Sequence, residues 1–300
     1  MIPPPATAVP TLRLRHGTSM PQLGLGVWQM SDTETEAAVG AALDAGYRLV
    51  DTAAAYRNEE AVGRALRTSG VSRDEVFVTT KLWLDDYGAD AARRACAASL
   101  ARLGLDRVDL FLVHWPVPAE GRAALEAYRV LEELHADGRA SAVGVSNFSI
   151  EDLERLRVDG RTTPSVNQVE LHPYFPQREL REYAWKRGIV VQAWSPIGGS
   201  SGSGGGAGMG RGATLLAEPV LAGIAERVGR SPAQVVLRWH VQRGVSVVPK
   251  SVRPERIAEN LRIFDFTLSD TDLALVDGLD SGRRGGPDPA AVNFSTFRRG

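Results

Sequence analysis

The sequence has a single cysteine, Cys96, among its 300 residues. One cysteine excludes a framework of internal disulfide bonds, and we expect a reducing, cytoplasmic environment. The 35 Lys and Arg residues nearly balance the 36 Asp and Glu residues, so no excess charge points to a nucleic acid partner. No run of apolar residues approaches the roughly 18 that a membrane span needs. The composition therefore gives no sign of a nucleic-acid or membrane partner.

Two stretches lack the patterns of regular structure. Residues 1–10, MIPPPATAVP, have neither the cationic nor the apolar region of a signal peptide, and we expect a flexible tail. Residues 198–212 are so rich in glycine and serine that they are predicted to form a flexible loop. A linker between domains is the alternative. Because strands and helices resume after the loop, we predict one domain over residues 11–300.

Short runs rich in leucine and β-branched residues alternate with longer segments of helical spacing. This alternation predicts parallel strands joined by helical crossovers, and eight such units within about 250 residues match a (β/α)8 TIM barrel, an α/β fold. The rival is a doubly wound Rossmann sheet, which normally carries G-x-G-x-x-G after its first strand. GLGVWQ at residues 24–29 lacks the third glycine, and TLRLRHGTSM before it predicts an N-terminal β-hairpin.

The element bounds follow from these patterns. The predicted strands are Leu23–Trp28, Arg48–Asp51, Val76–Lys81, Asp109–His114, Ala140–Ser146, Val166–Glu170, Val190–Trp194 and Ser246–Pro249. The predicted helices are Thr33–Ala45, Glu59–Arg67, Ala89–Leu103, Leu125–Ala136, Ile150–Arg157, Glu179–Arg187, Leu215–Arg227 and Pro232–Gln242.

Residues with reactive or hydrogen-bonding side chains stand at the carboxyl ends of most predicted strands. In chain order they are Asp51, Lys81, His114, Ser146, Gln168, Trp194 and Lys250. Taken singly, each has an ordinary explanation, such as a helix cap, a solvated lysine or a core histidine. The carboxyl ends of barrel strands all face the side where barrel active sites lie, so we expect these residues to converge there.

An acid, a lysine, a histidine and a nearby tyrosine together suit proton transfer. Tyrosine, with an ordinary pKa of about 10, is a poor acid, and a neighbouring Lys81 cation is expected to lower the pKa of Tyr56. Asp51 would keep Lys81 charged, while His114 would hold a carbonyl oxygen that Tyr56 protonates. The histidines form no H-x-H or H-E-x-x-H pattern, so no metal site is predicted. A hydride must then come from a cofactor.

At this point the sequence resembles the aldo-keto reductase superfamily, from about Thr11 to Phe297. The motifs that carry the resemblance, in the family's order, are MPQLGLGVWQM, DTAAAYRNEEAVGRAL, VTTKLW, DLFLVHWP, GVSNF, NQVELHPY, AWSPI and VVPKSVRPERIAENL. They are most similar to the bacterial branch that includes 2,5-diketo-gluconate reductases. The resemblance implies a catalytic tetrad with Tyr56 as general acid, its members being Asp51, Tyr56, Lys81 and His114.

The resemblance also implies NADPH as cofactor. Ser146, Asn147 and Gln168 match residues that hold the nicotinamide carboxamide, and Trp194 matches the aromatic residue on which the nicotinamide stacks. The segment that faces the pyrophosphate corresponds to Ser195, Ile197 and Gly198. The site of the 2′-phosphate corresponds to Lys250, Ser251, Val252 and Arg256, where two cations beside a serine suit a phosphate. The adenine-side contacts correspond to Glu259 and Asn260.

The implied reaction is reduction of aldehydes and ketones to alcohols, with hydride from nicotinamide C4 and a proton from Tyr56. The substrate pocket would be lined by His114 and by three tryptophans that follow strands, Trp28, Trp83 and Trp115, although packing at the barrel rim explains each tryptophan equally well. The substrate stays open, with 2,5-diketo-gluconate and methylglyoxal-like carbonyls as possibilities.

The short tail, rich in glycine and proline, predicts an open site, and we expect a monomer. Alternatives are alcohol oxidation by the same residues, or a cofactor-sensing or scaffold protein on this fold.

Overall fold

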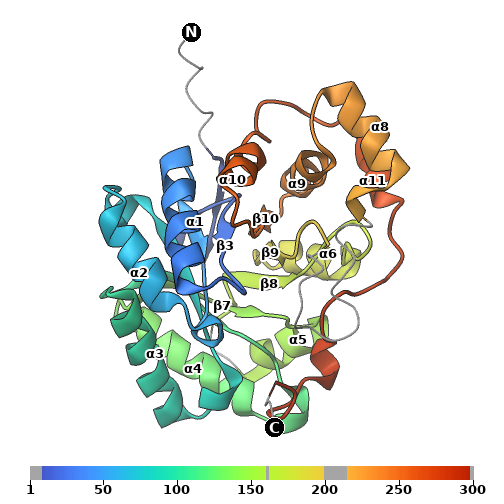
Figure 1. The fold of residues 1–300 in the computed structure, drawn as a ribbon. Helices are drawn as coiled ribbons and strands as arrows, with labels where there is room; N and C mark the ends of the chain where they lie inside the picture. The colour runs from blue at the N-terminus through green and yellow to red at the C-terminus, as the bar shows by residue number, and fades with distance from the viewer. Residues whose placement is uncertain (1–8, 160–161, 199–214, 298–300) are drawn as a thin grey trace.

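The computed structural model describes residues 9–159, 162–198 and 215–297 (Figure 1). Its centre is an eight-stranded parallel sheet in the order β10-β9-β8-β7-β6-β5-β4-β3. The strands are β3 (Leu25–Gly26), β4 (Leu49–Asp51), β5 (Phe77–Leu82), β6 (Val108–Val113), β7 (Ala140–Ser146), β8 (Val166–Glu170), β9 (Val190–Trp194) and β10 (Ser246–Val247). The predictions for residues 1–8 and for most of the glycine-rich loop fall outside the described residues.

Hydrogen bonds between the residues just before β3 and strand β10 close the sheet on itself. The Gly24 amide donates to the Val247 carbonyl at 2.9 Å, and the Val247 amide donates to the Gln22 carbonyl at 2.8 Å. The sheet order and this closure confirm the predicted (β/α)8 barrel with parallel strands. Strands β3 and β10 are shorter than predicted, and Pro249 has no amide hydrogen to extend the ladder beyond β10.

Helices surround the barrel (Figure 1). They are α1 (Asp32–Ala45), α2 (Glu59–Thr68), α3 (Ala89–Leu103), α4 (Ala123–Ala136), α5 (Ile150–Asp159), α6 (Arg178–Lys186), α8 (Pro219–Val228), α9 (Pro232–Gln242), α10 (Pro254–Leu261) and α11 (Asp270–Asp277). The prediction that one helix covers Leu215–Arg227 was wrong, because α8 begins at Pro219, a residue suited to a first helical turn. Helices α10 and α11, each eight residues long, were not among the predicted helices.

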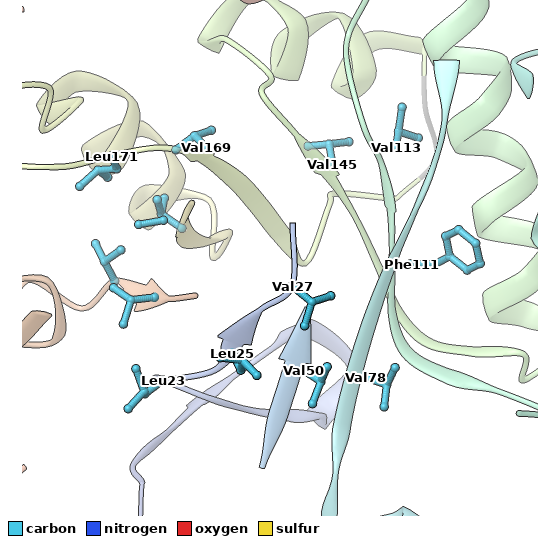
Figure 2. Close-up of a cluster of buried hydrophobic side chains, with 14 of the residues drawn as sticks. Leu23, Leu25, Val27, Val50, Val78, Phe111, Val113, Val145, Val169 and Leu171 are labelled. Carbon is cyan, nitrogen blue, oxygen red and sulfur yellow. The ribbon is translucent and has the colours of Figure 1, made fainter. Parts of the chain in front are cut away.

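The strands bury side chains on both faces. Leu23, Leu25 and Val27 point toward the helices together with residues of neighbouring strands (Figure 2). The glycines between them, Gly24 and Gly26, occupy crowded positions: a Cβ atom on Gly24 would lie 2.0 Å from the side chain of Leu49. The two glycines therefore leave room inside the barrel for neighbouring residues such as Leu49, and a larger residue at Gly24 would not fit.

A hairpin covers the end of the barrel where the strands begin. Strand β1 (Thr11–Arg13) pairs antiparallel with β2 (Ser19–Pro21), as predicted. Met20 of β2 is fully buried and packs in one cluster with Leu49 and Phe77, which stand at the starts of their strands. The barrel is therefore closed at this end, and the carboxyl ends of the strands are left for a site. In the described part of the chain, no helix is long and apolar enough to cross a membrane.

Candidate active site

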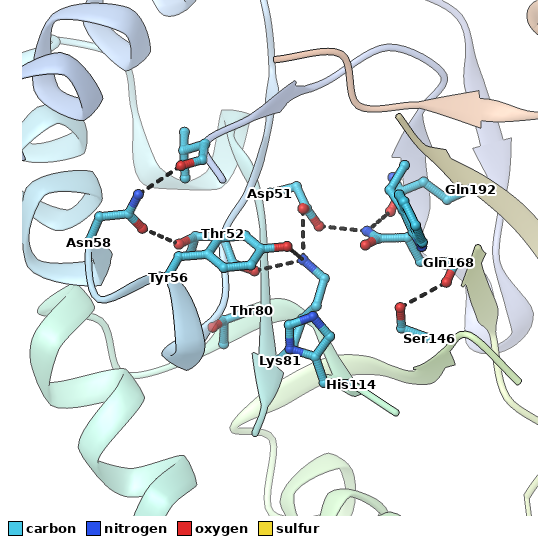
Figure 3. Close-up of polar contacts among 12 residues, drawn as sticks. Asp51, Thr52, Tyr56, Asn58, Thr80, Lys81, His114, Ser146, Gln168 and Gln192 are labelled. Carbon is cyan, nitrogen blue, oxygen red and sulfur yellow. Dashed lines mark hydrogen bonds and ion pairs between the residues drawn. The ribbon is translucent and has the colours of Figure 1, made fainter. Parts of the chain in front are cut away.

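Lys81 lies at the centre of a buried polar cluster at the carboxyl ends of β4 and β5 (Figure 3). Its Nζ atom is 2.7 Å from Asp51 Oδ2, 2.9 Å from the Thr52 carbonyl oxygen and 3.3 Å from the Tyr56 hydroxyl oxygen. The Lys81 side chain has no exposed surface. All three ammonium hydrogens therefore have acceptors, which compensates for taking the charge out of water. Since Lys81 is the donor to Tyr56, the phenol hydrogen is left for another acceptor.

Tyr56 is held in place by the short segment that follows β4. It ends a 3₁₀ turn, η2 (Ala54–Tyr56), and the chain then reaches Asn58, which is buried. Asn58 Nδ2 donates to the Val27 carbonyl at 2.8 Å, and Asn58 Oδ1 accepts from Thr52 Oγ1 at 2.9 Å. Sequence reasoning did not assign Asn58 a role, although it stands two residues after the tyrosine. Its amide joins the two ends of the segment that positions Tyr56, at Thr52 and Asn58, and ties them to the Val27 carbonyl.

Burial and charge act in opposite directions on the Tyr56 phenol. Burial raises its pKa, and the Lys81 cation lowers it by a smaller amount, so the pKa lies above its ordinary value. The expected lowering by Lys81 is present, but burial outweighs it. Burial disfavours the charged form of Lys81, yet Asp51 and Tyr56 raise the pKa of Lys81 above its ordinary value. At neutral pH the cluster therefore holds a neutral phenol beside a fixed cation.

His114 lies beside the phenol at the end of β6. Its ring centre is 5.9 Å from that of Tyr56 and 5.1 Å from that of Trp83, edge to face in both pairs. Burial, and then the Lys81 cation, lower the pKa of His114 well below its ordinary value. The imidazole is therefore neutral at physiological pH and keeps one donor and one acceptor nitrogen.

Gln168 meets Asp51 from the opposite side of the barrel (Figure 3). Its Nε2 atom donates to Asp51 Oδ1 at 2.6 Å and to Gln192 Oε1 at 2.6 Å. The neighbouring Ser146 hydroxyl donates to the Gln168 carbonyl at 2.8 Å. Asp51 thus accepts from Lys81 with one oxygen and from Gln168 with the other. The structure joins the predicted tetrad to a residue predicted to bind the cofactor.

Asn147 links the ends of three strands. Its Nδ2 atom donates to the His114 carbonyl at 3.0 Å, and its Oδ1 atom accepts from Trp194 Nε1 at 2.8 Å. The residue has a φ of 66°, a left-handed conformation that asparagine tolerates better than most residues. Asn147 therefore orients the Trp194 ring rather than presenting a free amide.

The segment after β9 is fastened to the helix layer by a histidine that sequence reasoning left unassigned. His240, buried in α9, is hydrogen-bonded through Nε2 to the Pro196 carbonyl at 2.9 Å. The Gly198 amide donates to the Ser195 carbonyl at 2.9 Å, and Ile197 packs against the core. These contacts place the predicted pyrophosphate segment next to the carboxyl end of β9.

A cationic segment leads into α10. Lys250 and Arg256 are exposed, while Ser251 is buried and its hydroxyl accepts from the Arg253 amide at 3.1 Å. The other residues predicted to contact the cofactor here differ in exposure: Val252 is exposed, Glu259 half-buried and Asn260 buried. The segment combines three exposed cations, Lys250, Arg253 and Arg256, with a turn held by a serine.

An aromatic cluster flanks His114. Phe297, which sequence reasoning missed, lies 5.2 Å from Trp83 and 5.4 Å from Trp115 between ring centres. Trp28, the third tryptophan predicted to line the pocket, is 41% exposed. Phe297 contradicts the expectation of an open site, because the tail brings a ring over the buried Trp115 and the half-buried Trp83. The tail's glycine and proline content gave no signal of this contact.

The tail is fixed to the barrel by a buried carboxylate, Glu170. Its oxygens accept from the amides of Gly285 at 2.5 Å and Gly286 at 3.0 Å, and from His172 Nε2 at 3.0 Å. Burial raises the pKa of Glu170, but these hydrogen bonds outweigh it and hold the pKa below its ordinary value. A Cβ atom on Gly286 would lie 2.5 Å from the Trp194 ring. The tail therefore passes against the edge of that ring.

Known proteins match this chain over nearly its whole length. The model of the Aldo/keto reductase family matches residues 16–281. Morphine 6-dehydrogenase of Pseudomonas putida is 50% identical over 96% of this chain and 97% of its own length. Methylglyoxal reductase DkgA of Escherichia coli is 45% identical over 93% of this chain and 96% of its own length.

A solved structure agrees with these matches. A mutant of Gox0644 in complex with NADPH has a TM-score of 0.86 and 42% sequence identity, covering 96% of this chain and all of its own. The family match and the relatives cover the barrel together with the residues of the buried cluster. The chain therefore belongs to the aldo/keto reductase family.

Proposed function

We propose that this protein reduces aldehydes and ketones to alcohols with NADPH. The observation that carries the proposal is the buried cluster of Lys81, in which Nζ lies 3.3 Å from the Tyr56 hydroxyl and 2.7 Å from Asp51. A phenol next to a fixed cation donates its proton more readily when negative charge develops on a nearby oxygen, because the cation stabilises the resulting phenolate. The cluster is therefore suited to protonating a carbonyl oxygen.

Each member of the tetrad has a distinct role in this proposal. A substrate carbonyl oxygen lies between the Tyr56 hydroxyl and the His114 imidazole. His114, neutral because its pKa is lowered, orients the oxygen by a hydrogen bond. Tyr56 gives its proton to that oxygen, and Lys81 stabilises the phenolate left behind. Asp51 keeps Lys81 charged and aimed.

The residues around the tetrad suit a nicotinamide cofactor. NADPH, when bound, would supply the hydride that the side chains cannot. Among the described residues none donates a hydrogen bond to Gln168 Oε1, which leaves an acceptor for the carboxamide. Trp194 is oriented for stacking by Asn147, and Lys250 and Arg256 would bind the 2′-phosphate that distinguishes NADPH from NADH. The bound NADPH in the Gox0644 complex supports the same choice.

The substrate class follows from the aromatic cluster and from the relatives. Trp83, Trp115 and Phe297 give the mouth an apolar wall beside the proton donor. Such a wall accepts carbonyl compounds with an apolar or planar group, and its three described rings offer no cation for a carboxylate. The names of the relatives, a methylglyoxal reductase and a morphine 6-dehydrogenase, span small and bulky substrates. We therefore place methylglyoxal and aromatic aldehydes ahead of 2,5-diketo-gluconate.

The test is a panel of carbonyl substrates assayed by the loss of NADPH absorbance. Methylglyoxal, 2,5-diketo-gluconate and several aromatic aldehydes are compared at equal concentration, and the panel is repeated with NADH. Turnover with NADPH that exceeds turnover with NADH is the expected result. NADPH binding without turnover of any substrate in the panel would contradict the proposal and favour a cofactor-sensing role.

A further inference from the structure

A chain of hydrogen bonds crosses the barrel interior from Asp51 to the hairpin at the opposite end. It runs from Asp51 through Gln168 and Gln192 to Ser246, and from there to the Pro21 carbonyl of β2. Asp51 is 3% exposed, and Gln168, Gln192 and Ser246 are each 1% exposed or less. Polar side chains in such a place are retained only when their hydrogen bonds are satisfied.

The direction of every hydrogen bond in this series is fixed by the groups at its two ends, the Pro21 carbonyl and the Asp51 carboxylate. The Pro21 carbonyl can only accept, so the Ser246 hydroxyl donates to it at 3.2 Å. The Ser246 oxygen is then the acceptor for Gln192 Nε2 at 3.1 Å, which turns Gln192 Oε1 toward Gln168. Gln168 must therefore present Nε2 to Gln192 and, with the second hydrogen, to the Asp51 carboxylate.

The donors of both amides are then fully used. Gln168 Nε2 has two hydrogens and two acceptors, each at 2.6 Å. Gln192 Nε2 likewise has two, the Ser246 hydroxyl and, more weakly, the Met20 sulfur at 3.8 Å. With Gln168 reversed, its oxygen would face two other oxygens at the same distances, which is unfavourable. The arrangement leaves Gln168 Oε1 as the one polar atom of that side chain with no hydrogen bond from the described residues.

We propose that Gln192 and Ser246 are positioning residues that fix the Gln168 amide so that its oxygen faces the carboxamide NH₂ group of the nicotinamide. This inference rests on the proposed function, because it assumes a nicotinamide cofactor. It predicts that the protein binds a cofactor with an N–H donor at the carboxamide more tightly than a cofactor of similar shape without that donor. The 3-acetylpyridine analogue of NADP⁺ has a methyl group in place of that NH₂ and is the matched probe.

The experiment measures equilibrium binding of NADP⁺ and of the acetylpyridine analogue, by quenching of tryptophan fluorescence without turnover. The unaltered protein is expected to bind NADP⁺ more tightly, because the analogue leaves the Gln168 oxygen unpaired. Gln192→Met leaves one Gln168 hydrogen without its acceptor, so that only Asp51 still fixes the amide and the Gln168 oxygen is held less firmly toward the carboxamide. The ratio of the two dissociation constants, analogue over NADP⁺, is expected to fall by roughly 10-fold, the effect of one buried unpaired group. Ser246→Ala is expected to lower this ratio by a smaller factor than Gln192→Met. It replaces Gln192→Met as the test if that variant does not fold.

Two further variants separate positioning from general damage. Gln192→Glu keeps an oxygen acceptor facing Gln168 and is expected to retain the ratio. Thr79→Val removes a buried barrel hydroxyl that has no hydrogen-bond partner among the described residues, and is expected to leave both constants unchanged. Equal weakening of NADP⁺ and analogue by Gln192→Met and Ser246→Ala would show a structural role only and overturn the inference. Failure of the unaltered protein to bind NADP⁺ would overturn the proposed function and, with it, this inference.

Discussion

Lys81 and Asp51 form an ion pair of 2.7 Å in which the lysine side chain is fully buried and the aspartate side chain is 4% exposed. The two charges come from adjacent strands, β5 and β4, whose register places Asp51 beside Thr79, two residues before Lys81. Taking two charges out of water is costly, and the pair offsets this only because hydrogen bonds satisfy both partners. The pair therefore has consequences for both stability and chemistry.

Asp51→Asn removes the negative partner and leaves the Lys81 charge uncompensated inside the barrel. The free energy of unfolding is expected to fall by about 3–5 kcal/mol, as when one partner of a buried pair is lost. Urea denaturation measures this directly. Asp74→Asn is the matched control, since its ion pair with Arg107 has the same 2.7 Å distance but is largely exposed, and little change is expected. Similar losses in both variants would contradict the account of the buried pair.

Arg256→Ala tests the proposed phosphate site at the start of α10. The variant is expected to bind NADPH roughly 10- to 100-fold more weakly, the effect of a lost charged hydrogen bond, and to bind NADH almost unchanged. Fluorescence titration with each cofactor measures both constants. Arg262→Ala removes an exposed cation at the other end of the same helix and controls for net charge. An equal effect of Arg256→Ala on the two cofactors would rule out contact with the 2′-phosphate.

His240→Gln tests how acid weakens the fold near the cofactor segment. Burial lowers the pKa of His240 to about 3, although its hydrogen bond to the Pro196 carbonyl opposes the shift. Above the ordinary pKa of about 6.5, both folded and unfolded states are neutral. Below it only the unfolded chain takes up the proton, so stability falls by about 1.4 kcal/mol per pH unit until the folded pKa is reached.

Glutamine keeps an N–H group for the Pro196 carbonyl but does not titrate. Between about pH 7 and about pH 5, the variant is therefore expected to lose roughly 2 kcal/mol less stability than the unaltered protein. Urea denaturation at several pH values measures the two slopes. Parallel slopes would mean that His240 takes up a proton as readily in the folded protein as in the unfolded chain.

Phe297→Ala tests whether the tail limits the size of the substrate. The ring covers Trp83 and Trp115, so its removal uncovers apolar surface for a larger carbonyl compound. The ratio of kcat/KM for a bulky aromatic aldehyde to that for methylglyoxal is expected to rise about 10-fold, a typical effect of pocket volume. Phe294→Ala, whose ring instead pairs with Tyr87, is the control. An unchanged or lower ratio for Phe297→Ala would place Phe297 outside the substrate site.

The sequence predicts the barrel well where local patterns determine it. The predicted bounds of β7, β8 and β9 are confirmed, because these strands are buried runs between clear helices. Helix α11 was missed although Ser269 and Asp272 form a capping box, since its eight residues give too short a periodic pattern. The convergence of strand ends followed from the parallel topology, and it brings Asp51, Lys81 and Gln168 into direct contact.

Residues that act through distant contacts were not visible in the sequence. Asn58 is hydrogen-bonded to the Val27 carbonyl, His240 to the Pro196 carbonyl and Gln192 to the Gln168 amide. In each pair the two residues are 24 to 44 positions apart in the sequence. No local spacing signals such contacts, because they depend on which strands and helices become neighbours. Phe297 likewise contacts Trp83 and Trp115, which are far from it in the sequence. The direction of the Tyr56 pKa shift also needed the structure, because burial opposes the lysine.

The most direct test of the proposed chemistry is Tyr56→Phe, assayed by NADPH oxidation with methylglyoxal and by NADP⁺ binding. Phenylalanine keeps the ring and removes only the proton donor, so the fold and the dissociation constant for NADP⁺ are expected to stay unchanged. The rate of reduction is expected to fall by roughly 10²- to 10⁴-fold, the usual contribution of a general acid. Turnover close to that of the unaltered protein, with NADP⁺ still bound, would contradict the assignment of Tyr56 as the proton donor.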